Sequence, residues 1–270
     1  MPQTWEQTLQ RTSIEHGLLC TFHEQIERLV RLTVAALVLD HEKRSFEQSL
    51  APVVQKLLSC LQETYQHSEA VQSLSLEPVL AQLSTLGPLF RSDIEAALLD
   101  DPATSDPVEV MFCYPGFKAV SAHRIAHIFY RLHWPLLPRM IAERAHQETG
   151  IDIHPGAQIG SHFFIDHGTG TVIGETAIIG NRVTLYQGVT LGAKRFHRDQ
   201  EGMVIKGEAR HPILGDQVTV YSGATILGRI MIGEGSIIGG NVWLTESVPS
   251  KSRITQQQFV SHLFRDGGGI

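Results

Sequence analysis

The sequence predicts an α+β protein in which an N-terminal all-helical domain is followed by a C-terminal left-handed parallel β-helix of hexapeptide repeats. Three observations support this fold. Apolar residues recur at three- and four-residue steps in the first half, aliphatic residues recur every six residues in the second half, and glycine becomes frequent where the second pattern begins. The first period is typical of amphipathic helices, and the second is typical of stacked β-coils.

Amphipathic helical patterns fill residues 1–148, which we expect to form the helical domain. The three- and four-residue steps are clearest in LLCTFHEQIERLVRLTVAALVL and in LAPVVQKLLSCL. Ser92 and Glu95 form a capping-box pattern, so a further helix is expected to begin there. Pro102 and Pro107 break the segment that follows this helix.

A six-residue period defines residues 149–248, which we expect to form the β-helix. Aliphatic residues recur at Ile173, Ile179, Leu185 and Leu191, and again at Leu214, Val220, Ile226, Ile232, Ile238 and Leu244. A six-residue unit with one large inward side chain cannot bury that side chain alone. Three units close a triangular coil of about eighteen residues, and stacked coils bury a continuous aliphatic column.

Two interruptions break the six-residue period. The step from Ile165 to Ile173 is eight residues, so two extra residues are expected to bulge out at DHGTGTV. The step from Leu191 to Leu214 is 23 residues, and its polar, charged insert predicts a protruding loop at 193–212. Binding residues commonly lie on loops that a rigid scaffold supports.

Composition and charge exclude several functional classes. Lysine and arginine number 22 against 28 acidic residues, a net charge of -6 without a basic stripe, which argues against nucleic-acid binding. The N-terminus does not resemble a signal peptide, and the apolar stretch LVRLTVAALVLD is too short for a membrane span. Three widely spaced cysteines indicate neither a disulfide framework nor a zinc knuckle, so a cytoplasmic location is expected.

Asp152 and His167 suggest a general base with an orienting partner. They lie fifteen residues apart, slightly less than one coil, so neighbouring coils can bring them together. A carboxylate that accepts a hydrogen bond from one imidazole nitrogen fixes the tautomer and raises the basicity of the other nitrogen. The spacing is equally compatible with a turn-capping Asp152 and a polar surface His167.

Charged residues close to Asp152 and His167 in the sequence are suited to binding the ammonium and carboxylate groups of an amino acid. Arg210 and His211 lie where the protruding loop returns to the repeat, and Asp166 precedes His167. A guanidinium can bind a carboxylate in a bidentate pair, while an acid can hold an ammonium group. An ordinary surface ion pair is the commoner explanation for any one of these residues alone.

Several segments resemble the signature segments of serine O-acetyltransferases. These are DIHPGAQIG, DHGTGTVIGETAIIG, GVTLG and RHPILGD, and DPATSDPVEVMFCYPGFKAVSAHRIAH resembles the end of that family's helical domain. The resemblance covers roughly residues 101–248 and the extreme C-terminus. It implies transfer of an acetyl group from acetyl-CoA, as co-substrate, to the hydroxyl of L-serine, giving O-acetylserine in cysteine biosynthesis. It implies no metal and no prosthetic group.

The resemblance also implies roles for individual residues on the acceptor side. His167 matches the general base of the family, and Asp152 matches the other member of its dyad. Asp101 and Asp166 match the positions that hold the amino group of serine. Glu175 matches a further position of the active site.

Further matches concern the substrate carboxylate and the acetyl donor. Arg210 and His211 match the positions near the carboxylate of serine. Acetyl-CoA is expected along the coils between neighbouring subunits, with backbone contacts at Gly192, Ala193 and Ser222. Ala193 replaces a second glycine that the family often has, and its small side chain still lets the pantetheine arm approach the backbone.

The resemblance implies partners as well as substrates. A homotrimer or a dimer of trimers is expected, with L-cysteine as a feedback inhibitor that competes at the serine site. Residues 249–270 are expected to form a C-terminal tail, and Ile270 resembles the isoleucine that this family inserts into O-acetylserine sulfhydrylase. A frayed glycine-rich terminus is the alternative.

Three other functions remain open at the level of sequence. The acceptor can instead be homoserine or O-phosphoserine, because one methylene or one nearby cation decides such preferences. A zinc β-helix enzyme of the gamma carbonic anhydrase type would use three histidines contributed across a subunit interface, for which His162, His167 and His211 are candidates. A non-enzymatic regulator of O-acetylserine sulfhydrylase would use Ile270 without consuming acetyl-CoA.

Overall fold

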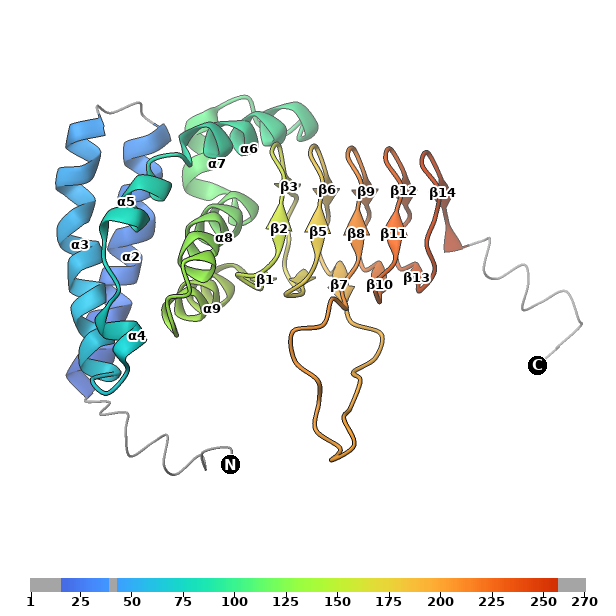
Figure 1. Cartoon of the computed structure of the whole chain (residues 1–270). Helices are drawn as coiled ribbons and strands as arrows, with labels where there is room; N and C mark the ends of the chain where they lie inside the picture. The colour runs from blue at the N-terminus through green and yellow to red at the C-terminus, as the bar shows by residue number, and fades with distance from the viewer. Residues whose placement is uncertain (1–15, 39–42, 257–270) are drawn as a thin grey trace, which may run out of the picture. The chain divides into compact units, whose positions relative to one another are not determined.

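The computed structural model describes residues 16–38 and 43–256 (Figure 1). The chain separates into two compact units. Of the described residues, one unit contains 16–38, 43–91 and 124–141, and the other contains 92–123 and 142–256. Within the described ranges, no helix is long and apolar enough to cross a lipid bilayer.

The first half of the chain is helical, as the three- and four-residue pattern predicts. The helices are α2 (His16–Val38), α3 (Lys43–Thr64), α4 (Glu69–Gln72), α5 (Glu77–Leu83), α6 (Gly87–Asp100), α7 (Pro107–Cys113), α8 (Pro115–Arg131) and α9 (Leu137–Thr149). Apolar faces explain their packing, since Phe22 and Leu29 of α2 and Leu50 and Leu57 of α3 are buried.

The predicted helix start at Ser92 is wrong, because α6 begins at Gly87. Pro88 follows directly, and the first turn of a helix tolerates its missing N–H group. Ser92 and Asp93 lie inside the helix and are buried. The Ser92 hydroxyl accepts a hydrogen bond from the backbone N–H of His162 at 3.1 Å, and the Asp93 carboxylate accepts one from that of Phe163 at 3.1 Å. These side chains therefore satisfy a turn of the β-helix rather than the end of their own helix.

Short parallel strands form the predicted β-helix. They are β1 (Asp152–Ile153), β2 (Gln158–Ile159), β3 (Phe164–Ile165), β4 (Val172–Ile173), β5 (Ile178–Ile179), β6 (Thr184–Leu185), β7 (Thr190–Gly192), β8 (Ile213–Leu214), β9 (Thr219–Val220), β10 (Thr225–Leu227), β11 (Met231–Ile232), β12 (Ile237–Ile238), β13 (Trp243–Leu244) and β14 (Arg253–Ile254). The first sheet has the order β1-β4-β7-β10-β13, the second β11-β8-β5-β2, and the third β14-β12-β9-β6-β3. Each of the first four coils thus contributes one strand to each of three sheets, and the last coil contributes β13 and β14 to the first and third sheets (Figure 1).

The aliphatic column is confirmed residue by residue. All ten aliphatic positions of the predicted repeat are at most 4% exposed, and they pack in one core cluster. Register explains the column, because Ile179 lies directly beside Leu214 and Leu185 directly beside Val220 on neighbouring coils. Ala119 and Val120 of α8 belong to the same core cluster.

The regular coils continue beyond residue 248, where the sequence pattern placed the start of the tail. Strand β14 pairs with β12, with Ile254 beside Ile238. Ser236 stabilises this last turn, since its hydroxyl donates to the Pro249 carbonyl at 3.0 Å and accepts from the Ser252 N–H at 3.1 Å. A buried serine therefore anchors the last coil, in which Val248 and Ile254 pack against the core.

The two interruptions of the repeat both fall at corners of the coil. The eight-residue step lies between the third and first sheets, where His167 and Gly168 adopt positive φ angles of 57° and 83°. The neighbouring coils turn here in six residues. We call residues 166–171 the histidine corner.

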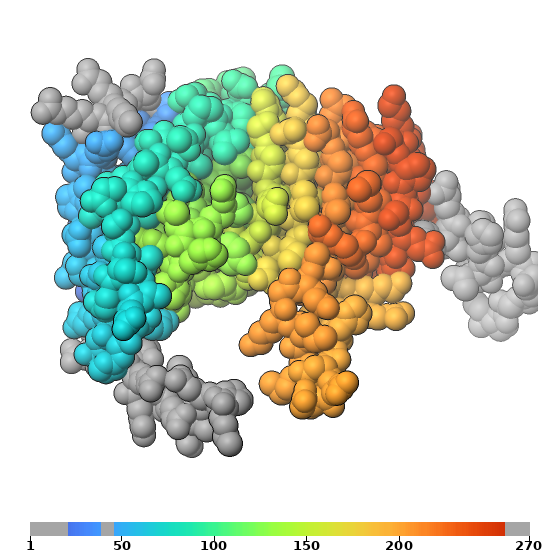
Figure 2. Space-filling model, in the orientation of Figure 1, coloured from blue at the N-terminus to red at the C-terminus, as the bar shows by residue number. Residues whose placement is uncertain are grey.

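The second interruption is the protruding loop, residues 193–212, between the first and second sheets. It stands out from the stacked coils in Figure 2. Arg198 and Val204 form an antiparallel bridge, and the Asp199 carboxylate accepts hydrogen bonds from the N–H groups of Glu201 and Met203 at 3.1 and 2.8 Å. The loop is therefore a short hairpin with its own turn.

Candidate active site

A first group of polar residues surrounds the histidine corner. We call Asp101, Tyr114, Asp166 and His167 the histidine cluster. The Tyr114 hydroxyl donates to Asp101 Oδ2 at 2.5 Å, and the Ala103 N–H donates to Asp101 Oδ1 at 2.8 Å. These hydrogen bonds, the one from Tyr114 first, lower the pKa of Asp101, and the charge of His167 lowers it further. The Asp101 carboxylate is thus held ionised near the imidazole.

His167 lies on the bulge in an exposed position. Its side chain is 72% exposed, whereas that of the adjacent Asp166 is 21% exposed. Nδ1 of His167 lies 3.7 Å from Oδ1 of Asp166, a distance for an ion pair when the ring is protonated. Corner residues of the same and later coils, such as His162 and Arg182, share its left-handed backbone, so this conformation belongs to the turns of the β-helix.

Asp152 lies next to this corner, on the preceding coil. It is the first residue of β1, and its backbone N–H donates to the carbonyl of Thr171 at 2.9 Å. The neighbouring Ile153 is buried, so the Asp152 side chain points to the outer face of the first sheet. No hydrogen bond or ion pair joins Asp152 to His167 in the described part of the chain, and their dyad stays a prediction.

Two stacked tyrosines continue this corner on the following coils. The rings of Tyr186 and Tyr221 lie 5.0 Å apart and nearly parallel, with 10° between their planes. Burial raises the pKa of Tyr186, and the charges of Tyr221 and Asp166 raise it further. The phenol of Tyr186 is therefore neutral at physiological pH.

A second group of polar residues lies between the first and second sheets. We call Glu175, Thr176, Arg210 and His211 the arginine cluster. Nη2 of Arg210 lies 2.7 Å from Oε2 of Glu175, and both side chains are about a quarter exposed, at 27% and 26%. The Thr176 hydroxyl accepts hydrogen bonds from the N–H groups of Arg210 at 2.9 Å and His211 at 3.1 Å. Thr176 thus fixes the point where the protruding loop rejoins the coil.

His211 is a buried, neutral imidazole. Burial is the main cause that lowers its pKa to about 4, and the nearby Arg210 cation lowers it further. Nδ1 accepts a hydrogen bond from the N–H of Thr176 at 3.0 Å, which leaves Nε2 to carry the ring proton. His211 can therefore donate a hydrogen bond to a substrate oxygen without changing its charge.

Residues that the sequence pattern did not single out hold both clusters. Tyr114 orients Asp101, and Thr176 orients His211. Nη1 of Arg229 donates to the carbonyls of Thr176 at 2.7 Å and His211 at 3.0 Å. Nothing in the spacing marks these residues, although Thr176 follows Glu175 in the GETA segment.

The predicted contacts with the acetyl donor lie at two corners. Gly192 ends β7 and pairs with Leu227, and Ala193 begins the protruding loop. Ser222 lies instead between the third and first sheets, where its carbonyl accepts from the N–H of Asn241 at 2.8 Å. The first sheet separates Ser222 from the other two residues.

The same separation holds for the two clusters. Thr171 ends the histidine corner, and Glu175 follows β4 on the other side of the first sheet. Glu175 is four residues further along the extended chain than Thr171, a step of roughly 13 Å at the usual rise of a strand. One small amino acid cannot contact both clusters of the same chain at once.

The three candidate zinc ligands also lie apart. His162 follows β2 and precedes β3, His167 precedes β4, and His211 precedes β8, so each occupies a different corner. Within residues 16–38 and 43–256, no three His, Cys, Asp or Glu side chains converge as a metal site. Ile270, the predicted contact with a sulfhydrylase, lies outside the described residues.

Comparisons with known proteins agree in pointing to one family. Residues 21–122 match the family model described as serine acetyltransferase, N-terminal. The plasmid serine acetyltransferase of Synechococcus elongatus is 61% identical over 182 residues, which cover 67% of this chain and 57% of that protein. The chain thus spans less than two thirds of this relative's length.

Solved structures extend the likeness over most of the chain. Entamoeba histolytica serine acetyltransferase 1, in complex with L-cysteine, has a TM-score of 0.71 and 32% identity, covering 88% of this chain and 97% of that one. Soybean serine acetyltransferase complexed with serine has a TM-score of 0.56 and 31% identity, covering 82% of this chain and 93% of that one.

Proposed function

Because this chain belongs to the serine acetyltransferase family, we propose that it transfers the acetyl group of acetyl-CoA to the hydroxyl of L-serine, producing O-acetylserine for cysteine biosynthesis. The observation that carries the proposal is the histidine cluster, in which a basic imidazole on a bulge adjoins two carboxylates suited to an ammonium group. The solved relatives complexed with serine and with L-cysteine support an amino-acid substrate.

His167 acts as the general base in the proposed reaction. The serine oxygen attacks the thioester carbonyl and forms the new C–O bond while His167 accepts the hydroxyl proton. The C–S bond then breaks, and the same proton passes from His167 to the departing thiolate of CoA. Asp152 orients the ring when the bound substrates bring the two side chains together, since apo hydrogen bonds at active sites are often long.

The two clusters hold the two ends of serine. Asp101 and Asp166 bind the ammonium group, because both carboxylates lie near His167 and Asp101 is ionised well below neutral pH. Arg210 binds the carboxylate group of serine, and His211 donates its Nε2–H to the same group. Glu175 keeps the guanidinium of Arg210 in place.

A second copy of the chain brings these clusters together. The first sheet separates them within one chain, so the histidine cluster of one protomer must face the arginine cluster of its partner. A cyclic trimer supplies three such sites, each identical. Its interfaces also place Gly192, Ala193 and Ser222 along the acetyl-CoA groove, and they shield the exposed His167 from water.

Two regulatory partners complete the proposal. L-cysteine carries the same ammonium and carboxylate groups as serine, so it competes at the serine site. The C-terminal Ile270 binds the active site of O-acetylserine sulfhydrylase through its terminal carboxylate. Deleting Ile270 is expected to abolish sulfhydrylase binding without changing acetyl transfer.

The decisive experiment measures thiol release from acetyl-CoA with L-serine, homoserine and O-phosphoserine. We expect serine-dependent release that falls by at least about a hundredfold in His167→Ala, because general bases contribute roughly 10²–10⁴-fold. His162→Ala, which removes an imidazole from another corner, is the matched control.

Other results of this experiment would favour one of the alternative functions. Release with homoserine or O-phosphoserine in preference to serine would reassign the acceptor and leave the chemistry intact. Sulfhydrylase binding without any thiol release would favour the regulator. Stoichiometric zinc in the purified protein, with loss of activity on chelation, would favour the carbonic anhydrase type.

A further inference from the structure

The protruding loop carries apolar side chains that stay exposed to solvent. Phe196, Met203 and Ile205 are 62%, 66% and 40% exposed. Met203 and Ile205 are two residues apart in an extended limb, so they project to the same side of it. Exposed apolar residues that gather on one element among charged residues are typical of protein interaction sites.

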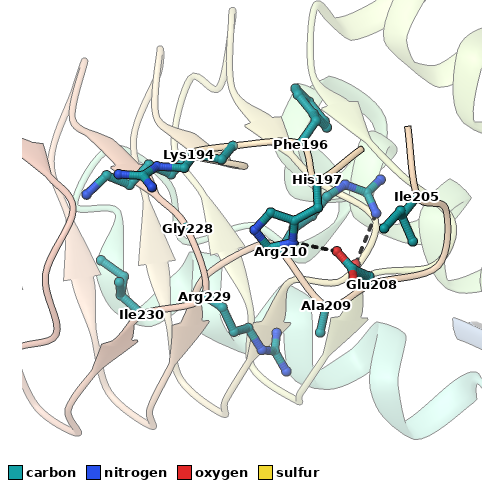
Figure 3. Close-up of a pocket in the computed structure, with 11 residues that line it drawn as sticks. Lys194, Phe196, His197, Ile205, Glu208, Ala209, Arg210, Gly228, Arg229 and Ile230 are labelled. Carbon is teal, nitrogen blue, oxygen red and sulfur yellow. Dashed lines mark hydrogen bonds and ion pairs between the residues drawn. The ribbon is translucent and has the colours of Figure 1, made fainter. Parts of the chain in front are cut away.

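Internal hydrogen bonds hold the loop as a preformed element. Arg198 and Val204 bridge its two limbs, and the Ile205 N–H donates to the His197 carbonyl at 2.9 Å. Nearer the base, Nδ1 of His197 lies 2.8 Å from Oε2 of Glu208 (Figure 3). A preformed loop loses less conformational entropy when it docks than a flexible one does.

A second exposed apolar surface adjoins the histidine cluster. Val108 and Phe112 of α7 lie one helical turn apart and are 54% and 72% exposed, whereas Val110 between them is buried. Leu99, near the end of α6, is 72% exposed. The chain reaches Tyr114 of the histidine cluster two residues after Phe112. We call Leu99, Val108 and Phe112 the α7 surface.

The charges around the two surfaces are complementary. Residues 92–117 contain six acidic residues and neither lysine nor arginine. Asp100, Asp106 and Glu109 are the exposed acids beside the α7 surface. The protruding loop contains five lysines and arginines against three acidic residues. Opposite charges around two apolar surfaces speed their encounter and fix their register.

The loop and the α7 surface of one chain lie on opposite sides of the coil. Helix α6 packs beside the third sheet, since Ser92 accepts from the turn before β3 and the Thr184 hydroxyl of β6 donates to Asp100 at 2.9 Å. The protruding loop leaves from the corner between the first and second sheets, which faces away from the third sheet in a three-sided coil. A partner for the loop therefore comes from another molecule.

A second copy of this chain is the partner that fits. The proposed function places the arginine cluster of one protomer against the histidine cluster of its neighbour. Arg210 and His211 end the protruding loop, so the loop of one protomer begins beside the neighbour's histidine cluster. A limb of six residues extends roughly 20 Å, which is long enough to pass this cluster and reach α7.

We propose that the apolar face of the protruding loop docks on the α7 surface of the neighbouring protomer and closes the histidine cluster. The proposal rests on the proposed function, which decides which clusters meet. The side chain of His167 is 72% exposed in the single chain. A docked loop covers it and excludes water from the proton transfer.

A cross-link tests the contact directly. Cys113 is an exposed free thiol at the end of α7, next to Phe112. In Met203→Cys, a short bismaleimide is expected to join the new thiol to Cys113 of the neighbouring chain. Denaturing gels would then show species of two and three chains.

Three controls belong to the cross-linking experiment. The wild type and the double variant Met203→Cys/Cys113→Ser should give single chains only, because each lacks one of the two thiols. Lys251→Cys places a thiol at an exposed position of the last coil, away from the loop, and should also give single chains.

A double-mutant cycle tests whether apolar residues of the two surfaces meet. Met203→Ser and Phe112→Ser are each expected to lower kcat/KM for serine about 5- to 20-fold. The double variant should lose little more, because either substitution alone breaks the same contact. Val204→Ser, on the other side of the same limb, is the matched control and should stay within about twofold of the wild type.

The results separate this proposal from its alternatives. Additive losses in the double variant would overturn the docked loop, and so would thiol release by a wild type whose Met203→Cys variant forms no link between chains. Loss of O-acetylserine sulfhydrylase binding in Met203→Ser, with acetyl transfer unchanged, would assign the loop to that partner instead. Links between chains in a protein that releases no thiol would support the docked loop and refute the proposed function.

Discussion

At the scale of single residues, Tyr114 shows how a side chain outside the predicted site can set substrate affinity. Its hydroxyl donates to Asp101, the carboxylate proposed to bind the ammonium group of serine. For Tyr114→Phe we expect the KM for serine to rise about 3- to 10-fold, because one hydrogen bond to a charged group is lost. Steady-state kinetics with serine and acetyl-CoA varied in turn would measure this.

A change in the KM for serine alone distinguishes a positioning role of Tyr114 from a general loss of enzyme activity. The kcat and the KM for acetyl-CoA are expected to stay within about twofold, since Asp101 contacts neither thioester nor base in the proposed reaction. Tyr221→Phe removes a hydroxyl from a neighbouring coil that does not reach Asp101, and it should behave as wild type. An unchanged KM for serine in Tyr114→Phe would contradict the positioning role.

His211 predicts a pH dependence of stability. Its pKa is lowered from 6.5 to about 4, so between these values the unfolded chain binds more protons than the folded chain. The free energy of unfolding must then fall as pH decreases from 6.5 towards 4, by up to about 3 kcal/mol from this residue. Urea denaturation at several pH values would reveal the slope, which His211→Asn is expected to reduce. An equal slope in both proteins would show that other groups cause it.

At the scale of secondary-structure elements, the close packing of α8 against β3 depends on a glycine. A Cβ at Gly116 would lie 2.0 Å from the carbonyl oxygen of Ile165, closer than any real contact. Gly116→Ala must therefore shift the start of α8, and we expect a loss of roughly 1–3 kcal/mol in the free energy of unfolding. Activity should fall as well, because Tyr114 precedes α8 and Asp166 follows β3.

A matched substitution separates this contact from ordinary helix propensity. At Gly87, the first residue of α6, an added Cβ would meet the Leu37 carbonyl at 3.3 Å and the flexible Arg91 side chain at 3.4 Å. Gly87→Ala is expected to change stability by less than about 1 kcal/mol. Similar losses for both variants in urea denaturation would argue against the close approach at Gly116.

At the scale of the whole molecule, the separation of the two clusters predicts complementation between inactive variants. His167→Ala retains an intact arginine cluster, and Arg210→Ala retains an intact histidine cluster. If each site takes one cluster from each of two chains, random mixing in a cyclic assembly restores about a quarter of the sites. The activity of co-refolded mixtures would measure this, and mixtures no more active than their components would contradict shared sites.

The sequence predicts the scaffold of this molecule better than its site. The six-residue period identifies the inward position of each coil, because a triangular coil has room for only one large side chain per side, as Ile226 and Ile238 illustrate. The step of eight before Ile173 also predicts the bulge that carries His167. Both results follow from local regularity and its interruption.

The hydrogen-bond partners of the site residues come from tertiary contacts that the six-residue period does not predict. The hydroxyl of Tyr114, which follows α7, donates a hydrogen bond to Asp101, which follows α6. Arg229 donates to the carbonyl of His211 from the following coil. Ser92 looks like a helix-capping residue in sequence, yet its tertiary contact with the turn at His162 overrides that local preference. Such long-range hydrogen bonds require the three-dimensional fold.

The placement of both interruptions at corners has an evolutionary consequence. The protruding loop adds many residues between Leu191 and Leu214, yet Ile179 still pairs with Leu214 and Ile226 with Leu191. Insertions at a corner therefore leave the strand register and the core untouched. A corner segment can consequently be exchanged among descendants of this chain without a compensating change in the aliphatic column.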